Sequence, residues 1–567
     1  MAPVAVPGGD ATLSWQDERA WRVLALGPGS ELLFLAGWLR WREDARRPDL
    51  LHVACVLPAP APPEALHALG GEQPQLQGLA EALAARWQGL LPGFHRFSFE
   101  QGRVLLTVCV GDTASLLREH DFQADAVWVR AAATLADTLK PLTRLCRRGA
   151  TLACEGEGDP ASLHGDLQSA GWTRLAAPAG TLCARYEPAW TLRREPAAAA
   201  AVPSRAIVVG AGLAGAAAAA SLARRGWSVL VVDAAPAPAA GASGLPIGLM
   251  APHQSPDDNL LSRLTRAGIR ITLQEAQDRL APGLEWAPTG VLQWRGDDAR
   301  PLPELGEALA PWSRPASDAQ KRAAGWDAAQ PAWWHQNAGW IEPAALVRSW
   351  LRQPGVRFLG GWTVRRILRE GAQWRIEADD GQRVAVAPLV VVAAALATGI
   401  LVGQPLRLQP VRGQVTWAPR PDDTAGLPPF PVNGNGHFLP DVPLVERGAW
   451  ITGSTYGRAD ADPACRPQDD AANLQRLRPL VPRAADALAD ASTRAWSGVR
   501  CASSDRRPLV GEVAPGLWVS TAMGSRGLSF AALCAELLAA RLHQEPLPLP
   551  AKLAQALSAT RQPSPGG

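Results

Sequence analysis

Three glycines near the middle of the chain have the spacing of a dinucleotide-binding loop. The pattern Gly210-x-Gly212-x-x-Gly215 follows the apolar run Ala206–Val209 and opens an alanine-rich stretch of helical length. In such a loop the first glycine makes a tight turn, the second lets a pyrophosphate approach the backbone, and the third lets the helix pack close to the strand. A second apolar run ends at Asp233, where a ribose hydroxyl needs an acceptor. The segment therefore predicts a strand–turn–helix–strand unit that binds a dinucleotide.

The start of the predicted helix would hold the phosphates. Free N–H groups and the positive end of the helix dipole lie beside Leu213 and Ala214. Ile207–Ala223 is almost uninterrupted apolar sequence, so a membrane span is the alternative. Arg224 and Arg225 follow at once, however, and three glycines within six residues make a poor spanning helix. Alanine-rich low complexity is a second alternative, and the ordered glycine spacing argues against it.

The composition limits the class of protein. A chain of 567 residues is too long for one hydrophobic core, so two or three domains are expected. The net charge of +3 neither requires nor excludes an RNA partner. Eight scattered cysteines without a CxxC pair predict a reducing compartment and no metal site. The first residues, MAPVAVPGGD, lack the features of a secretion signal, so we expect a cytoplasmic protein that does not bind a membrane.

The first 187 residues alternate short apolar runs with stretches of helical character. Gly27-Pro28-Gly29 follows the first of these runs, and the apolar stretch Leu32–Trp41 comes next. A helix over Leu135–Leu139 should be limited by Pro141. Alternating strands and helices predict a doubly wound α/β domain. The expected strands are Val23–Leu26, Leu51–Val56, Val104–Val110, Ala126–Val129 and Ala150–Cys154.

This region resembles the N-terminal methyltransferase half of the MnmC family, the bifunctional tRNA 5-methylaminomethyl-2-thiouridine biosynthesis proteins. The resemblance rests on Leu90–Asp112, LLPGFHRFSFEQGRVLLTVCVGD, and on Asp125-Ala126, which matches the start of the next strand. It implies a Rossmann-like methyltransferase fold for residues 1–187.

The positions that would carry methyl transfer differ from the family. Its glycine-rich loop, roughly GFGTGLN, is replaced by the run Gly27–Leu33, GPGSELL. The acid that holds the cofactor ribose should fall near Leu57, which cannot accept a hydrogen bond. The family's DGFAP segment is Arg130–Thr134, and its arginine reverses the charge where an amine must be held. Asp112 alone matches, and a turn residue at a strand end is its alternative. We therefore expect the fold to be kept, with S-adenosylmethionine binding and methyl transfer weak or absent.

Residues 188–204 are expected to form a linker, with prolines near both ends and five alanines. From residue 205 the chain resembles the glycine oxidase/D-amino-acid oxidase superfamily and the C-terminal half of MnmC. Gly241-Ala242-Ser243-Gly244 with Gly248 resembles the second flavin-contacting loop, although a flexible surface loop is the alternative. Gly524-Ser525-Arg526-Gly527-Leu528 matches the family's GSRGL, which directs a helix start at the flavin. The resemblance implies bound FAD, with the main chain near Val364 against the adenine.

Arg500 is the residue that the resemblance assigns to the substrate. The segment Gly498–Gly511 resembles the G-[LV]-R…D-x-x-P-x-[VI]-G pattern of glycine-oxidase-like enzymes, in which the arginine holds a carboxylate. A guanidinium can bind a carboxylate through two parallel hydrogen bonds, and a structural ion pair is the alternative. Gln414 and Tyr456, on separate strands, are expected to face the isoalloxazine, unless they are ordinary residues of the sheet surface.

The expected fold class is therefore α/β, with an N-terminal methyltransferase-like domain and a C-terminal FAD-binding Rossmann domain that carries an inserted α+β substrate domain. Leu389–Ile400 should be a buried parallel strand ending in an ATG turn, and Ala344–Leu351 a helix. The expected ranges are 205–285, 340–405 and 498–545 for FAD binding, 286–339 and 406–497 for the substrate domain, 205–550 for the whole oxidoreductase, and 551–567 for a tail.

The resemblance implies a function in tRNA modification. FAD-dependent oxidation would remove the carboxymethyl group of 5-carboxymethylaminomethyl-2-thiouridine at the wobble position, leaving 5-aminomethyl-2-thiouridine and glyoxylate. In the family, S-adenosylmethionine-dependent methylation follows. The alternative is an oxidase of a free amino acid such as glycine or sarcosine, with a relic N-terminal half. A further hypothesis makes residues 1–187 a non-catalytic tRNA-docking module.

Overall fold

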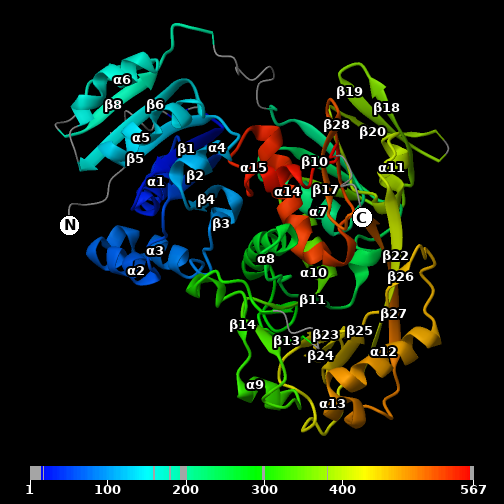
Figure 1. Ribbon diagram of the computed structural model, residues 1–567. Coiled ribbons are helices and arrows are strands. Elements are labelled where there is room, and N and C mark those ends of the chain that lie inside the picture. The colour runs from blue at the N-terminus through cyan, green and yellow to red at the C-terminus, as the bar shows by residue number, and fades with distance from the viewer. Residues whose placement is uncertain are drawn as a thin grey trace. The chain divides into compact units, whose positions relative to one another are not determined.

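The computed structural model describes residues 15–16, 18–157, 160–177, 180–191, 201–295, 301–379 and 381–561. The chain divides into two units, Met1–Val202 with Ala539–Ala554 and Pro203–Leu538 with Gln555–Gly567 (Figure 1). Most of the expected linker, residues 192–200, lies outside the described residues.

The first unit contains an eight-stranded sheet in the order β3-β4-β2-β1-β5-β6-β8-β7. β1 is parallel to β2 and β5, β2 to β4, and β5 to β6, while β3, β7 and β8 pair antiparallel. The strand order reverses between β1 and β5, so a ligand crevice is expected beyond the carboxyl ends of these two strands. The strands are β1 (Ala20–Leu26), β2 (Leu50–Leu57), β3 (Gly93–Phe99), β4 (Val104–Val110), β5 (Ala124–Ala131), β6 (Cys146–Glu157), β7 (Trp172–Leu175) and β8 (Leu182–Tyr186).

Both faces of this sheet are covered by helices. Val23 and Ala25 pack on one face with residues of α1 and α3, whereas Leu24 and Leu26 pack on the other with residues of α5. Strands buried on both sides read as continuous apolar runs, which is why all five expected strands are confirmed. The helices are α1 (Ser30–Glu43), α2 (Pro63–Glu72), α3 (Gln77–Ala84), α4 (Thr113–Arg118), α5 (Ala132–Thr143) and α6 (His164–Ser169).

The expectation that Pro141 limits its helix is wrong. α5 continues to Thr143 with Pro141 inside it. A proline in the last turn removes only one hydrogen bond, and continuing the helix buries Leu142 completely in the core.

The second unit is built on a six-stranded sheet in the order β17-β10-β9-β21-β29-β28. Its strands pair in parallel except for the β28–β29 hairpin, and the order reverses between β9 and β21. The strands are β9 (Arg205–Val209), β10 (Ser228–Val232), β17 (Val356–Leu359), β21 (Leu389–Val392), β28 (Leu509–Ala514) and β29 (Leu517–Thr521). Its helices include α7 (Leu213–Ala223), α8 (Leu260–Arg279), α9 (Asp318–Ala323), α10 (Pro343–Leu351), α11 (Thr398–Leu401), α14 (Gly527–His543) and α15 (Ala551–Gln555). The boundary between the units falls within both α14 and α15.

A nine-stranded sheet, called here the substrate sheet, forms the inserted part of this unit. Its order is β14-β15-β13-β23-β24-β25-β22-β26, and β27 pairs with β22. Its strands are β13 (Val291–Trp294), β14 (Arg314–Pro315), β15 (Ala332–His335), β22 (Leu408–Pro419), β23 (Val432–Gly434), β24 (Gly436–Val442), β25 (Ala449–Gly453), β26 (Gly457–Arg458) and β27 (Arg494–Ser503). Two small sheets complete the unit: β11 (Gly248–Met250), β12 (Trp286–Ala287) and β16 (Gly339–Ile341), and β18 (Val364–Glu370), β19 (Gln373–Ala378) and β20 (Arg383–Ala387).

The two faces of the substrate sheet have different neighbours. Phe438 and Trp450 point to one face, which α12 (Pro467–Leu480) and α13 (Pro482–Ala487) cover (Figure 1). Val415 and Leu439 point to the other face and pack with Ile247, which precedes β11. Successive side chains of a strand alternate between the two faces of the sheet. Alternate positions along these strands therefore pack against the helices on one face and against the segment after Gly244 on the other.

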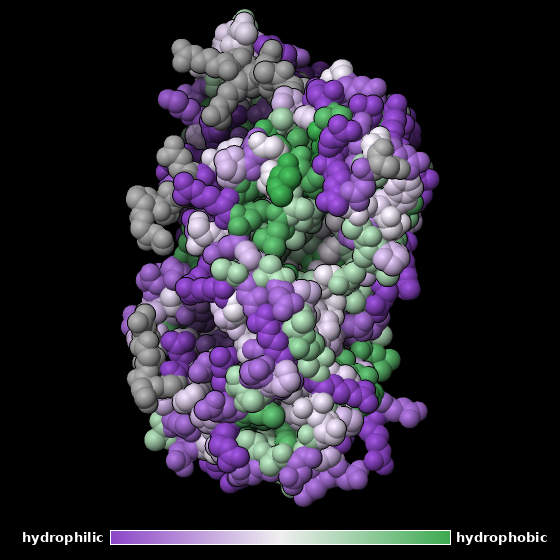
Figure 2. All heavy atoms as spheres, turned by 90° about the vertical axis from the view of Figure 1, so that its right-hand side faces the viewer, coloured by the Kyte–Doolittle hydropathy of each residue, from purple (hydrophilic) through white to green (hydrophobic). Residues whose placement is uncertain are grey.

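Two expectations for the oxidoreductase half need correction. The strand expected over Leu389–Ile400 ends at Val392, because its parallel partner β9 ends at Val209, opposite it. The chain then turns into α11, and Ile400 is 83% exposed. On the face that Figure 2 shows, hydrophobic residues gather in patches among hydrophilic ones. Residues 555–561 are not a free tail, because they pair with β28. The N–H of Val510 donates to the carbonyl of Leu557, and the N–H of Ala559 donates to the carbonyl of Val510.

The ion pairs of Asp505 should stabilise this returning C-terminal segment. Arg561 donates to its carboxylate at 2.7 and 2.9 Å, and Arg507 at 2.6 Å. Burial opposes ionisation, but the bonds from Arg561 outweigh it and hold the pKa of Asp505 well below its usual value. We predict that Asp505→Asn lowers the free energy of unfolding by about 2 kcal/mol near neutral pH.

The pH dependence of this effect has a definite sign. Because the folded-state pKa of Asp505 is depressed, its stabilisation is present above about pH 4 and is lost as the pH falls further. Urea titration followed by tryptophan fluorescence measures the difference. Asp379→Asn, which removes an exposed pair with Arg365, is the control and should change nothing measurable. Equal midpoints for the two variants at pH 7 would contradict the prediction.

Candidate active site

The glycine-rich loop lies at the reversal point of the six-stranded sheet. Gly210 has φ +110°, and a Cβ there would lie 2.5 Å from the carbonyl oxygen of Ala393, which follows β21. A Cβ at Gly215 would lie 1.8 Å from the oxygen of Gly210. Neither position accepts a side chain, so the loop leaves bare backbone at the start of α7, as phosphate binding requires.

Asp233, just after β10, ties this loop to its neighbours. Its carboxylate accepts hydrogen bonds from the backbone N–H of Ala211 at 2.6 Å and of Ala235 at 2.8 Å. Its carbonyl accepts from Trp362 at 2.9 Å, two residues before Val364. Each carboxylate oxygen keeps acceptor capacity, so Asp233 as ribose acceptor and Val364 beside the adenine stay predictions that this geometry permits.

The other two loops for which the sequence predicts flavin contact, residues 241–248 and 524–528, lie beside the glycine-rich loop. The hydroxyl of Ser243 accepts a hydrogen bond from the N–H of Leu213 at 3.0 Å, so it caps α7. A Cβ at Gly248 would lie 2.6 Å from the Leu528 side chain, and one at Gly527 would lie 3.2 Å from that of Leu213. The structure therefore brings together Gly210, Gly212, Leu213, Ala214, Gly215, Ala242, Ser243, Gly244, Gly248, Gly524, Ser525, Arg526, Gly527 and Leu528.

Strand β27 carries Arg500 past two of these loops, because it contacts both Ala242–Gly244 and Gly524–Arg526. The Nη2 atom of Arg500 donates to the hydroxyl of Ser454 at 3.0 Å, and the guanidinium lies 5.7 Å from the ring centroid of Tyr456. Among the described residues no carboxylate lies within ion-pair distance of Arg500, so the alternative of a structural ion pair finds no partner. Burial lowers the pKa of Arg500, with Tyr456 opposing. An uncompensated, partly buried cation favours an anionic ligand.

Gly413 makes room for this guanidinium. A Cβ at Gly413 on β22 would lie 1.6 Å from Nη2 of Arg500. A second cation, Arg526, is also partly buried; burial lowers its pKa, as does Arg506, while Tyr456 opposes. Tyr456 itself is 45% exposed. Two partly buried cations, Arg500 and Arg526, thus lie near the exposed ring of Tyr456.

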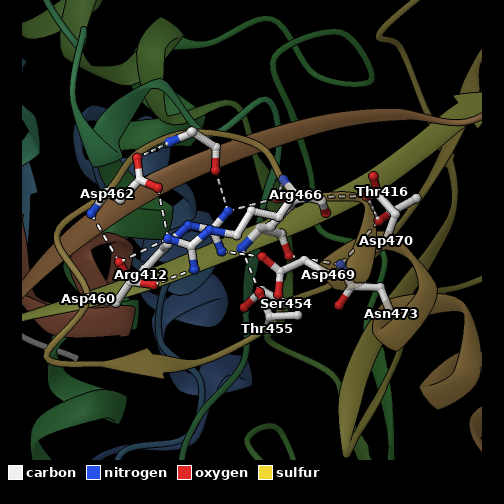
Figure 3. Close-up of polar contacts among 12 residues, drawn as sticks. Arg412, Thr416, Ser454, Thr455, Asp460, Asp462, Arg466, Asp469, Asp470 and Asn473 are labelled. Carbon is white, nitrogen blue, oxygen red and sulfur yellow. Dashed lines mark hydrogen bonds and ion pairs between the residues drawn. The ribbon is translucent and has the colours of Figure 1, made fainter.

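The expectation that Gln414 shares this pocket is wrong. Its neighbour Gly413 faces Arg500, so alternation directs Gln414 to the face that α12 covers. There its side chain is fully satisfied: the oxygen accepts from Arg412 at 2.9 Å and from the N–H of Arg466 at 2.8 Å, and the amide donates to the Arg466 carbonyl and to Asp470, both at 2.9 Å. Figure 3 shows the surrounding polar network, in which Arg412 pairs with Asp469.

Sequence reasoning missed Gly413, Ser454 and His437. No local motif marks them, and only the register of antiparallel strands β22, β24 and β25 places them near Arg500.

At the reversal point of the first unit, a side chain of β5 lies against the glycine-rich loop. Gly29, after β1, has φ +81°, and a Cβ there would lie 2.6 Å from Nη1 of Arg130, at the end of β5. Glu31, in the first turn of α1, is 3% exposed. Burial raises its pKa, against the backbone N–H groups of Glu31, Ala61 and Gly29 and the charge of Arg130. Asp112 caps α4 through Ser115 at 2.8 Å, as its turn alternative supposed.

Among the described residues, no group of three or more histidine, cysteine, aspartate or glutamate side chains could hold a metal ion. No helix in the same part of the chain is long and apolar enough to cross a membrane.

The fold and the loops define a flavin-dependent oxidoreductase of the DAO class, and residues 205–541 match the family model described as FAD dependent oxidoreductase. The fold is similar to that of glycine oxidase from Geobacillus kaustophilus (TM-score 0.52, 18% identity, 64% of this chain and 100% of that chain). It is also similar to L-proline dehydrogenase from P. horikoshii (TM-score 0.51, 16% identity, 62% and 96%).

Relatives of nearly full length identify the family more closely. The chain is 44% identical to the tRNA 5-methylaminomethyl-2-thiouridine biosynthesis bifunctional protein MnmC of Polaromonas naphthalenivorans (strain CJ2), over 96% of this chain and 90% of the relative. It is 45% identical to the protein of that name from Delftia acidovorans (strain DSM 14801 / SPH-1), over 97% and 92%. The chain belongs to the MnmC family.

The close approach at Gly215 gives a direct test of the cofactor loop. We predict that Gly215→Ala reduces the FAD content of the purified protein at least about tenfold, because the new methyl group collides with the Gly210 carbonyl. Gly78→Ala is the matched control, since Gly78 is an exposed residue of α3 in the first unit and a Cβ there meets no atom within 4 Å. Flavin absorbance per protein measures the result, and circular dichroism verifies folding. Equal flavin content in two folded variants would contradict a dinucleotide site at this loop.

Proposed function

We propose that the chain removes the carboxymethyl group of 5-carboxymethylaminomethyl-2-thiouridine at the tRNA wobble position by FAD-dependent oxidation. The products would be 5-aminomethyl-2-thiouridine and glyoxylate. The observation that carries the proposal is Arg500, a partly buried cation without a carboxylate partner among the described residues, on a strand that contacts two of the flavin loops. The names of the relatives supply the tRNA base.

The modified base carries an N-substituted glycine, which explains why a glycine-oxidase-like site suits it. Arg500 would bind the carboxylate through two hydrogen bonds, a contact worth about 1.5–3 kcal/mol. Bound FAD would supply the hydride acceptor for oxidation of the glycine methylene. The C–N single bond becomes C=N, water adds to that carbon, and cleavage of the C–N bond leaves a primary amine and glyoxylate. Arg500 contributes by orienting the methylene and Gly413 by leaving room for the guanidinium.

The second cation and the exposed ring fit the rest of the substrate. Arg526 and Tyr456 line the pocket beside Arg500, so they would accept an anionic nucleotide and stack or hydrogen-bond with a base. A free amino acid needs neither. Similarity to MnmC proteins along almost the whole chain favours the tRNA substrate over the free amino acid, and such a substrate implies a cytoplasmic enzyme.

The first unit, we propose further, has a methyltransferase-type fold that no longer binds S-adenosylmethionine. Its strand order provides the expected crevice beyond β1 and β5. Arg130 covers the glycine loop at that point, and the buried Glu31 stands where the family loop has glycine. Leu57, fully buried at the end of β2, offers no acceptor for a ribose. Three positions thus oppose cofactor binding, and tRNA docking stays a prediction for this unit.

Replacing Arg500 tests the oxidative step. Arg500→Ala should retain FAD and lower turnover of carboxymethylaminomethyl-tRNA at least about 100-fold, because the carboxylate loses its charged partner. Arg500→Lys keeps the charge without the planar guanidinium, so its turnover should lie between those of the wild type and Arg500→Ala. Mass analysis of the wobble nucleosides measures the product. An Arg500→Ala enzyme as active as wild type would remove this residue from its role.

The cofactor of the first unit is tested by calorimetric titration. We predict no saturable binding of S-adenosylmethionine to the wild-type protein, because Arg130 lies against the glycine loop and the buried Leu57 offers no acceptor for a ribose. The double variant Glu31→Gly/Arg130→Asp restores the family's residues at both positions and should bind more tightly than wild type. Micromolar binding by the wild type would overturn the proposal.

A further inference from the structure

The face of the substrate sheet that carries Arg500 also carries two glycines and a histidine. Across neighbouring strands, His437 of β24 lies opposite Gly453 of β25, and Gly453 opposite Val415 of β22. Residues opposite each other on paired strands share a face, so His437 shares the face of Val415. Gly413 lies two residues from Val415 and shares this face too.

Arg500 lies on the same face, on the neighbouring strand β27. It lies opposite Val411 on β22, which has the parity of Gly413 and Val415. Its guanidinium extends over Gly413, whose missing side chain leaves that space free. Between His437 and Arg500, this face carries two glycines, Gly453 and Gly413, and the side chain of Val415. His437 and Arg500 therefore lie on one face, with bare backbone at the two glycine positions between them.

His437 has an unused polar atom on this face. Its Nε2 atom is buried and has no hydrogen-bond partner among the described residues. Burial, together with the positive charge of Arg500, lowers the pKa of His437 to about 4. The imidazole is consequently neutral at physiological pH, and one ring nitrogen carries a free lone pair. A buried, unpaired nitrogen in a protein interior requires an explanation, and a ligand between His437 and Arg500 provides one.

We propose that Nε2 of His437 accepts a hydrogen bond from the secondary amine of the substrate while Arg500 binds its carboxylate. The inference rests on the proposed function, because it assigns the second contact of the same N-substituted glycine. Carboxylate and amine are separated by a single methylene, so two anchors would fix the carbon that is oxidised. Donating its N–H leaves the amine lone pair free to form the C=N bond.

The charges of the pocket select the reactive form of the amine. Arg500 disfavours a second positive charge nearby, as its effect on His437 shows. A neutral imidazole can accept the N–H of a free amine without requiring the ammonium form. The substrate would therefore bind as the neutral amine, its proton having passed to solvent, and His437 would discriminate an amine from an ether of the same shape.

The test uses anticodon stem-loop RNAs bearing either the carboxymethylaminomethyl group or its ether analogue, in which oxygen replaces N–H. Each RNA is mixed anaerobically with the FAD-loaded wild type, and binding is read from the change in flavin absorbance before the flavin is reduced. The amine RNA should bind about tenfold tighter than the ether RNA. His437→Phe should lose this preference while keeping its affinity for the ether RNA. His437→Gln, which restores an acceptor, should recover part of it.

The variants also separate the two claims. Arg500→Ala should weaken both RNAs, since both carry the carboxylate. If the wild type is reduced by the amine RNA and His437→Phe retains the full amine-over-ether preference, the role of His437 is overturned and the proposed function stands. If the wild type binds the amine RNA and its flavin stays oxidised, the proposed function fails, and the inference built on it fails too.

Discussion

A positive charge held partly out of water, with no carboxylate partner among the described residues, is the constraint on which the proposed active site depends. Arg500 can occupy its position because β22 has a glycine, Gly413, directly beneath the guanidinium. The cost of keeping such a charge from solvent is offset only when an anion binds. A carboxylate would supply the missing negative charge, as the proposed N-substituted glycine does.

Alternation along β22 separates structural chemistry from reactive chemistry. On the helix-covered face, Arg412 is neutralised by Asp469 and Gln414 is fully hydrogen-bonded (Figure 3). On the opposite face, Arg500 has no carboxylate partner among the described residues and His437 has an unpaired nitrogen. Satisfied polar groups hold α12 on the sheet and fix the strand. Unsatisfied ones are left for the ligand, and the two sets lie one residue apart.

Local patterns could be predicted from the sequence, and long-range register could not. The glycine loop, Asp233 and the strands of the first unit depend on neighbouring residues, so spacing alone located them. Gln414 was assigned to the wrong face, because the sequence of its own strand does not reveal which alternate side chains lie on the face of Arg500. His437 was missed since its partner Arg500 lies 63 residues further along. The strand at Leu389 was drawn too long because its end is determined by β9, far away in sequence.

One measurement tests the central claim most directly, namely that bound flavin oxidises a glycine unit on modified tRNA. The FAD-loaded protein is mixed without oxygen with tRNA carrying 5-carboxymethylaminomethyl-2-thiouridine, and the visible absorbance of the flavin is followed. The account predicts rapid loss of the oxidised-flavin spectrum together with release of glyoxylate. A flavin that stays oxidised while the tRNA is bound would contradict it.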